Sequence, residues 1–275
     1  VAMRNPSVLD VYEPGSTGKV MTVAAAMEEK KITPTTVLTV PDKLKRSVKV
    51  FSDHDPHPTQ RLTTSGILAV SSNTGSIKIG EMISNDKLYE YLTKFGIGTK
   101  TGSGLPGESR GILPKVADWS GTTAPTVAFG QGYSVTAMQA TSVFATIAND
   151  GVRVSPTVIA GTSDSSGNYT PSATRENVRV ISAETAANMR LMMESVVSAN
   201  GTAPSAAIPG YRVAGKTGTA QRIDDTCGYT EGTHHHLSAL HQMTSQHRDL
   251  STTPCRPVGG FPTTLCGPCR RANGE

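Results

Sequence analysis

The stretch P-G-S-T-G-K-V-M-T-V-A-A-A-M, residues 14–27, decides the fold of this chain. Its last eight residues are apolar on nearly every side, interrupted only by Thr22, which is typical of a helix buried between two layers of structure. The Pro-Gly pair in front breaks the chain, so we expect a helix over 16–30. Ser16 then opens this helix, and Lys19 lies one turn later on the same face.

Apolar periodicity and capping residues predict the elements around this helix. Further helices are expected at about 62–70, resuming near 76 after a pause at S-S-N-T-G, and at 85–95, 136–149 and 183–199. Loops are expected at 96–114, which is rich in glycine, and at 162–174, which is rich in serine and threonine. A strand is expected over 211–217, turning at Gly218.

The composition excludes several classes of protein. The chain has 275 residues, 36% of them hydrophobic, which is enough to bury a core. Charged residues make up 17% and the net charge is +4 without a basic stripe, so we expect no nucleic-acid partner. No apolar run approaches the ~20 residues of a membrane-spanning helix, and no signal peptide is present. We therefore interpret the chain as a fragment that has lost its targeting segment.

Three short motifs occur in a fixed order along the chain: S-T-G-K at 16–19, S-S-N at 71–73 and K-T-G-T at 216–219. Motifs of these types occur together in penicillin-binding proteins and related β-lactamases. Each type also has a second copy here, such as S-N-D-K at 84–87 and K-T-G at 100–102. We favour the first set because 16–19 opens a buried helix and 216–219 ends a strand, whereas 84–87 is typical of a solvated helix start.

The residue types of the favoured set predict acyl-transfer chemistry. Ser16 is the candidate nucleophile, and a serine hydroxyl needs a neighbouring base. Lys19 can serve only when neutral, which requires burial or a nearby positive charge such as Lys216. We expect both effects to act. Ser71 would relay a proton to the leaving amine, and Asn73 would orient the substrate amide.

The K-T-G-T strand is the candidate binding site for the substrate carboxylate. Lys216 with Thr217 or Thr219 would hold that carboxylate, and Gly218 lies between them on the same strand. Backbone N–H groups of Ser16 and Thr219 are the expected donors to the oxyanion, an arrangement that often supplies the largest catalytic effect.

The agreement with a known family extends beyond these motifs. It includes Y-E-P-G-S-T-G-K at 12–19, D-x-H-x-H at 53–57, L-T-T-S-G-I-L-A-V-S-S-N-T-G at 62–75, F-G-I-G at 95–98, T-G-S-G-L-P-G-E at 101–108, F-G-Q-G-Y-S-V-T at 129–136 and V-A-G-K-T-G-T-A-Q at 213–221. Over residues 1–228 the chain resembles the class B penicillin-binding proteins, and among them the division-specific septal peptidoglycan D,D-transpeptidases.

The resemblance implies an α+β fold of the penicillin-binding-protein and serine β-lactamase type, with a helical subdomain and an antiparallel sheet. It implies peptidoglycan stem peptides and lipid-linked precursors as substrates, covalent inactivation by β-lactam antibiotics, and cell-division proteins as partners. It places the protein on the extracytoplasmic face of the bacterial plasma membrane, held by an N-terminal anchor that this chain lacks. No cofactor and no metal are implied.

Both ends of the chain depart from the family pattern. The resemblance implies a five-stranded sheet with two strands before Ser16 and two after the K-T-G strand, so the transpeptidase domain at 1–228 is expected to lack its first and last strands. Residues 229–275 show no period of strand or helix, and we expect an aberrant, disordered tail produced by a reading-frame change. The C-x-x-C at 266–269 and the histidine run are then chance residues rather than redox or zinc sites.

Three rival functions remain open. A serine β-lactamase would need a carboxylate that activates water, for which Glu108 is the only candidate we identify. A β-lactam sensor would be acylated without turnover. A truncated or frameshifted chain would be catalytically inactive. His54 and His57 are interpreted as residues that order a loop rather than as metal ligands, since no third ligand is evident nearby.

Overall fold

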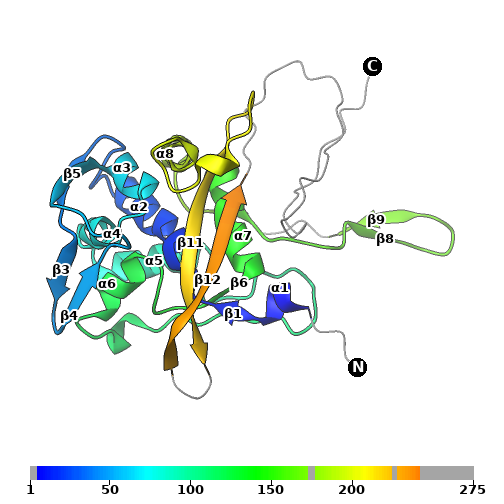
Figure 1. Cartoon of the computed structure of the whole chain (residues 1–275). Coiled ribbons are helices and arrows are strands. Elements are labelled where there is room, and N and C mark those ends of the chain that lie inside the picture. Colours follow the sequence, from blue (N-terminus) through cyan, green and yellow to red (C-terminus); the bar gives the residue numbers. More distant parts are fainter. Residues whose placement is uncertain (1–4, 173–176, 225–227, 242–275) are drawn as a thin grey trace. The chain divides into compact units, whose positions relative to one another are not determined.

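The computed structural model describes residues 5–172, 177–224 and 228–241, with side chains described up to Thr219. The fold is α+β, as expected (Figure 1). The helices are α1 (Pro6–Leu9), α2 (Lys19–Glu28), α3 (Thr64–Ala69), α4 (Asn73–Gly80), α5 (Asn85–Lys94), α6 (Thr123–Ala128), α7 (Ala137–Ala148) and α8 (Ala183–Val197), with 3₁₀ turns η1 (Gly15–Gly18), η2 (Val116–Asp118) and η3 (Pro204–Ala206).

Within the described ranges, the strands form antiparallel pairs. The pairs are β1 (Val11–Tyr12) with β6 (Val135–Thr136), β2 (Val37–Val40) with β5 (Gln60–Thr63), β3 (Lys43–Arg46) with β4 (Lys49–Ser52), β7 (Val152–Val154) with β10 (Asn177–Arg179), β8 (Gly161–Ser163) with β9 (Tyr169–Pro171), and β11 (Ala214–Asp224) with β12 (Gly228–His241).

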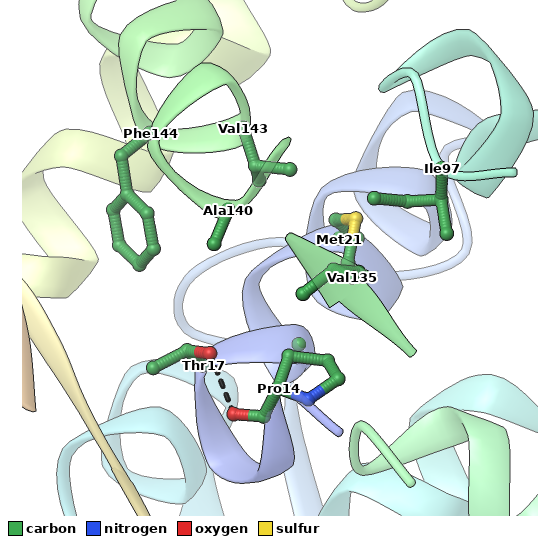
Figure 2. Close-up of a pocket in the computed structure, with 9 residues that line it drawn as sticks. Pro14, Thr17, Met21, Ile97, Val135, Ala140, Val143 and Phe144 are labelled. Carbon is green, nitrogen blue, oxygen red and sulfur yellow. Dashed lines mark hydrogen bonds between the residues drawn. The ribbon is translucent and has the colours of Figure 1, made fainter. Parts of the chain in front are cut away.

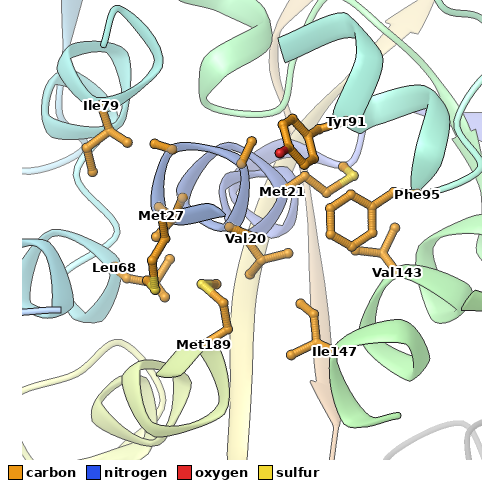
Figure 3. Close-up of a cluster of buried hydrophobic side chains, with 14 of the residues drawn as sticks. Val20, Met21, Met27, Leu68, Ile79, Tyr91, Phe95, Val143, Ile147 and Met189 are labelled. Carbon is orange, nitrogen blue, oxygen red and sulfur yellow. The ribbon is translucent and has the colours of Figure 1, made fainter. Parts of the chain in front are cut away.

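Helix α2 is the centre of the hydrophobic core. Every residue from Lys19 to Met27 is buried, because α2 contacts α3, α4, α5 and α8. Figure 3 shows the apolar side chains that surround it, which include Leu68, Ile79, Phe95, Ile147 and Met189. Each fully buried side chain of this size stabilises the fold by about 1.5–3 kcal/mol. The apolar stretch 20–27 therefore becomes a central helix, as its sequence predicts.

Most helix boundaries agree with the expected ones because their caps are explicit in the sequence. Ser182 caps α8 through the backbone N–H of Thr185, and Thr136 caps α7 in a capping box with Gln139. Two boundaries were expected elsewhere. The α-helix begins at Lys19 rather than Ser16, because residues 15–18 form the tighter turn η1. The pause at S-S-N-T-G is also shorter, and α4 already begins within it.

Three expectations about strands and loops are wrong. Strand β11 does not turn at Gly218, which pairs with residue 237 and lies inside a continuous ladder. The expected absence of regular structure after residue 228 fails for 228–241, since β12 gains main-chain hydrogen bonds to β11 that need no side-chain period. The loop expected at 162–174 contains the hairpin β8–β9, whose turn is closed by Asp164 accepting backbone N–H groups of Ser166 and Asn168. The domain boundary at 228 stays a prediction.

The tail residues that drew attention in the sequence lie outside the described part of the structure. These are Cys227, Cys255, Cys266 and Cys269, together with the side chains of the histidine run.

The Ser16 turn, η1, packs against the glycine-rich segment 130–133. Gly15 N–H donates to the Gly130 carbonyl at 2.8 Å, and Gly132 N–H donates to the buried carboxylate of Glu13 at 2.9 Å. A Cβ on Gly18 would overlap the Tyr133 hydroxyl and would lie 2.7 Å from Gly130 Cα. The backbone approach therefore admits only glycine at position 18.

We expect Gly18→Ala to lower the free energy of unfolding by about 1–3 kcal/mol, because the methyl group must displace Tyr133 or the 130–133 backbone. Urea denaturation measures this loss. Gly66→Ala in α3 is the matched control, since the atoms nearest to its Cβ lie 3.3 Å away or farther and alanine is the better helix former. Equal stability of the two variants would contradict the packing described for the Ser16 turn.

Candidate active site

Lys19 is a completely buried cation-forming side chain at the first position of α2. Its Nζ donates to the carbonyl oxygen of Ser71, and it also lies 3.2 Å from Ser71 Oγ. Burial lowers the pKa of Lys19 well below its ordinary value, the positive charge of Lys216 lowers it further, and Asp53 opposes both. Burial and the charge of Lys216 therefore both favour the neutral form of Lys19.

Ser71 lies in the sharp connection between α3 and α4 with a φ of +61°, a left-handed conformation that is rare for residues other than glycine. Such a conformation costs about 1–3 kcal/mol and persists only where the surrounding structure holds it. The bend turns the Ser71 hydroxyl toward both buried lysines, whose Nζ atoms lie 3.2 Å (Lys19) and 2.8 Å (Lys216) from it.

Lys216 lies on β11 and is 1% exposed. Its Nζ donates to Ser71 Oγ at 2.8 Å and to the Thr217 carbonyl at 3.1 Å, and burial lowers the pKa of Lys216 to about 7. A group with this pKa is partly protonated at neutral pH. The two lysines are thus joined through one hydroxyl, and the structure brings together one residue from each of the three sequence motifs.

Ser16 lies in η1, one turn before Lys19, and is partly exposed. Among the described residues, its hydroxyl makes no hydrogen bond. Strand β11 packs against η1, so the Ser16 turn and the K-T-G strand are neighbours in the fold. The structure therefore places Ser16 beside the lysine network but not in hydrogen-bond contact with it.

The remaining predicted site residues lie at the edge of this network. Asn73 begins α4, and its side-chain amide donates to the Ser52 carbonyl at 3.0 Å, not to either lysine. Thr217 and Thr219 are partly exposed on β11, and Gly218 is buried between them. These four residues lie at the start of α4, just after Ser71, and on strand β11, which carries Lys216.

Thr202 is a site residue that the sequence reasoning missed. Its backbone N–H donates to the Ala69 carbonyl at 3.2 Å, and its hydroxyl lies 2.7 Å from the Thr217 hydroxyl. It therefore links the end of α3, just before Ser71, to the K-T-G strand. The only signal in the sequence is that Thr202 follows Asn200-Gly201, a pair that is typical of the end of a helix.

The second copies of the motifs have ordinary structural roles. Ser84 caps α5 by accepting the backbone N–H of Lys87, whose side chain is exposed and pairs with Glu90. Lys100 is also exposed. Glu108 is buried, but it accepts hydrogen bonds from Thr101 and Ser103 of its own loop.

A small apolar crevice, partly open to solvent, lies beside Pro14 and Thr17 (Figure 2). Thr17 lies at one end of it, and its hydroxyl donates to the Pro14 carbonyl at 2.7 Å. The lining comes from η1, α2, α7 and β6, with Met21, Val143 and Phe144 among it. None of the polar residues of the network lines this crevice, so it is distinct from the candidate active site.

Two further searches bear on the wider function. No helix in the described part of the chain is both long and apolar enough to cross a membrane. The described residues also contain no cluster of three or more His, Cys, Asp or Glu side chains arranged to hold a metal ion.

Comparison with known proteins places the chain in a family. It is 43% identical over 232 residues to penicillin-binding protein PbpB of Mycolicibacterium smegmatis and 35% identical over 234 residues to peptidoglycan D,D-transpeptidase FtsI of Escherichia coli. These matches cover 82% and 81% of this chain but only 36% of each relative, so the chain spans about a third of their length.

Comparison with solved structures finds the same class of protein. The crystal structure of penicillin-binding protein 3 of Mycobacterium tuberculosis in complex with aztreonam matches with a TM-score of 0.82 and 39% identity, over 84% of this chain and 53% of that one. The family model of the penicillin-binding protein transpeptidase domain matches residues 2–244. With the three motifs meeting at Ser71 in this fold, the chain belongs to the penicillin-binding protein transpeptidase family.

Proposed function

We propose that this chain carries the catalytic centre of a septal peptidoglycan D,D-transpeptidase, with Ser16 as the residue that is acylated. The observation that carries the proposal is the convergence of Lys19 and Lys216, both buried and both with lowered pKa values, on the Ser71 hydroxyl. Burying two lysines costs stability, and such perturbed groups gather at functional sites.

The first step is activation of Ser16. A neutral amine has two N–H donors and one lone pair, and Lys19 directs its donors to the carbonyl and hydroxyl of Ser71. The lone pair is then left to accept the Ser16 proton while Ser16 Oγ attacks the carbonyl carbon of the penultimate D-alanine. The resulting oxyanion is met by the backbone N–H groups of Ser16 and Thr219.

The second step is departure of the terminal D-alanine. Ser71 Oγ receives hydrogen bonds from both lysines, which occupy its two lone pairs and leave its own O–H free to donate. We infer that Ser71 gives this proton to the leaving nitrogen as the C–N bond breaks and recovers one from protonated Lys19. An amine of a neighbouring stem peptide then attacks the acyl ester, and Ser16 regains its proton.

The residues around the two lysines and Ser71 bind the substrate. The substrate carboxylate is held by charged Lys216 with the hydroxyl of Thr217 or Thr219, along the strand that contains Gly218. Asn73 accepts from the substrate amide. The hydrogen bond of Thr202 to Thr217 supports the proposal that the α8–β11 loop closes this side of the site.

The proposed substrates are peptidoglycan stem peptides on lipid-linked precursors, on the extracytoplasmic face of the plasma membrane, with cell-division proteins as partners. Support comes from the relatives that are named peptidoglycan D,D-transpeptidases and from the relative solved with aztreonam, a β-lactam. Hydrolysis by a β-lactamase mechanism is disfavoured because Glu108 is occupied by its own loop.

We expect Ser16→Ala to reduce covalent labelling by fluorescent penicillin to background, because the acylated oxygen is gone. Gel fluorescence and the peptide mass of the adduct measure this. Ser84→Ala, in the second S-x-x-K copy, is the matched control and should label as the wild type does. Labelling that persists in Ser16→Ala would remove Ser16 from its role. A wild-type chain that is folded but never labelled would favour the inactive fragment.

We expect the second-order acylation rate of penicillin to fall above about pH 7, because Lys216 has a pKa of about 7 and must be charged to hold the penicillin carboxylate. Lys216→Arg keeps the charge at high pH, so the alkaline limb should disappear in this variant. Lys100→Arg, in the second K-T-G copy, should leave the profile unchanged. An alkaline limb that survives in folded Lys216→Arg would contradict the role of Lys216.

A further inference from the structure

Asp53 is a buried carboxylate that the proposed chemistry does not use. It follows β4, its side chain is 8% exposed, and it caps the helix that begins with Asn73. Asp53 Oδ1 accepts the backbone N–H of Asn73 at 2.6 Å and of Thr74 at 2.9 Å. Ser72 accepts the next N–H, from Gly75, at 2.9 Å. The first turn of α4 is therefore held mainly by a residue 20 positions away in sequence.

This cap also fixes the Asn73 side chain. Its Nδ2 donates to the carbonyl of Ser52, the residue next to Asp53, at 3.0 Å. Asn73 is thus tied to the 52–53 segment by both its backbone and its side-chain nitrogen. Within the described residues, its side-chain oxygen makes no hydrogen bond and is available to a substrate N–H.

His57 contacts the carboxylate oxygen of Asp53 that does not cap α4. Its Nε2 lies 3.0 Å from Asp53 Oδ2 and its Nδ1 lies 2.7 Å from the Pro58 carbonyl. Both partners are acceptors, so His57 can donate to both of them only when both ring nitrogens carry a proton. The Pro58 and Asp53 hydrogen bonds raise the pKa of His57, and the charges of Asp53 and Asp42 add to the effect.

We propose that Asp53, held by His57, is a positioning residue that sets Asn73 and the Ser71 bend against the two lysines; this rests on the function proposed above. A second effect of Asp53 is electrostatic. Its negative charge raises the pKa of Lys19, against burial and against Lys216, which both lower it. Asp53 therefore limits how far the pKa of Lys19 falls, so that the base stays strong enough to take the Ser16 proton.

The charge of Asp53 can be removed with little change of shape. In Asp53→Asn the side-chain oxygen still accepts the N–H groups of α4, but as a weaker neutral acceptor. We expect acylation by penicillin to fall about tenfold, which corresponds to the difference between charged and neutral hydrogen bonds. We also expect the acid limb of its pH profile to move to lower pH, because Lys19 loses the charge that raised its pKa. A purely structural role would not move that limb.

Asp55→Asn is the matched control, because Asp55 is exposed on the same turn. It should keep the wild-type rate and profile. If Asp53→Asn and Asp55→Asn have the same rate and the same acid limb, the inference is overturned while the proposed function stands. A wild-type chain that penicillin does not acylate would overturn the proposed function and the inference with it.

The His57 contact has a separate pH signature. The pKa of His57 in the folded chain is raised above 6.5. The contribution of the His57–Asp53 contact to the stability of the fold is therefore complete below about pH 6.5 and is lost as the pH rises through the folded-state pKa. We expect the melting temperature of His57→Gln to lie below that of His54→Gln at pH 5.5 and the gap to narrow at higher pH. His54 is exposed, which makes it the matched control. A difference in melting temperature between the two variants that does not change with pH would contradict a charged His57–Asp53 pair.

Discussion

The hydroxyl of Ser71 is the contact on which the site depends. It is shared by two lysines that are almost completely buried, one at the start of the central helix and one on β11. Two ammonium groups that both contact one hydroxyl in a protein interior would repel each other strongly. The neutral form of at least one of the two amines is therefore favoured. The bend at Ser71 and the lowered pKa of Lys19 belong to one arrangement, because the Ser71 hydroxyl lies between the two amines.

The rest of the fold serves to bring these three residues together. Helix α2 is surrounded by apolar side chains, so the first residue of α2 is placed with its amine away from water. The close approach of Gly15 and Gly18 to the 130–133 segment fixes the turn that carries Ser16. Asp53 fixes the start of α4 on the other side of Ser71. Each wall of the site is thus held by a contact from a distant part of the chain.

Much of this arrangement could be predicted from local sequence. The apolar stretch 20–27 predicts a buried helix, and the helices expected at 136–149 and 183–199 agree with α7 and α8 because helix starts depend on a few adjacent residues. The pairing of β11 with β12 could not be read, since main-chain ladders need no particular side chains. Thr202 and Asp53 were missed as site residues because their partners lie 15 and 20 positions away.

The most direct test of the lysine network is the titration of Lys19 and Lys216 themselves. Lysine labelled with ¹³C at Cε reports the charge of each amine by NMR, and Lys19→Arg and Lys216→Arg assign the two signals. We expect Lys216 to titrate near pH 7 and Lys19 to titrate well below its ordinary value. If both amines instead titrate near 10.5, the ordinary value for lysine, Lys19 cannot act as the base that takes the Ser16 proton.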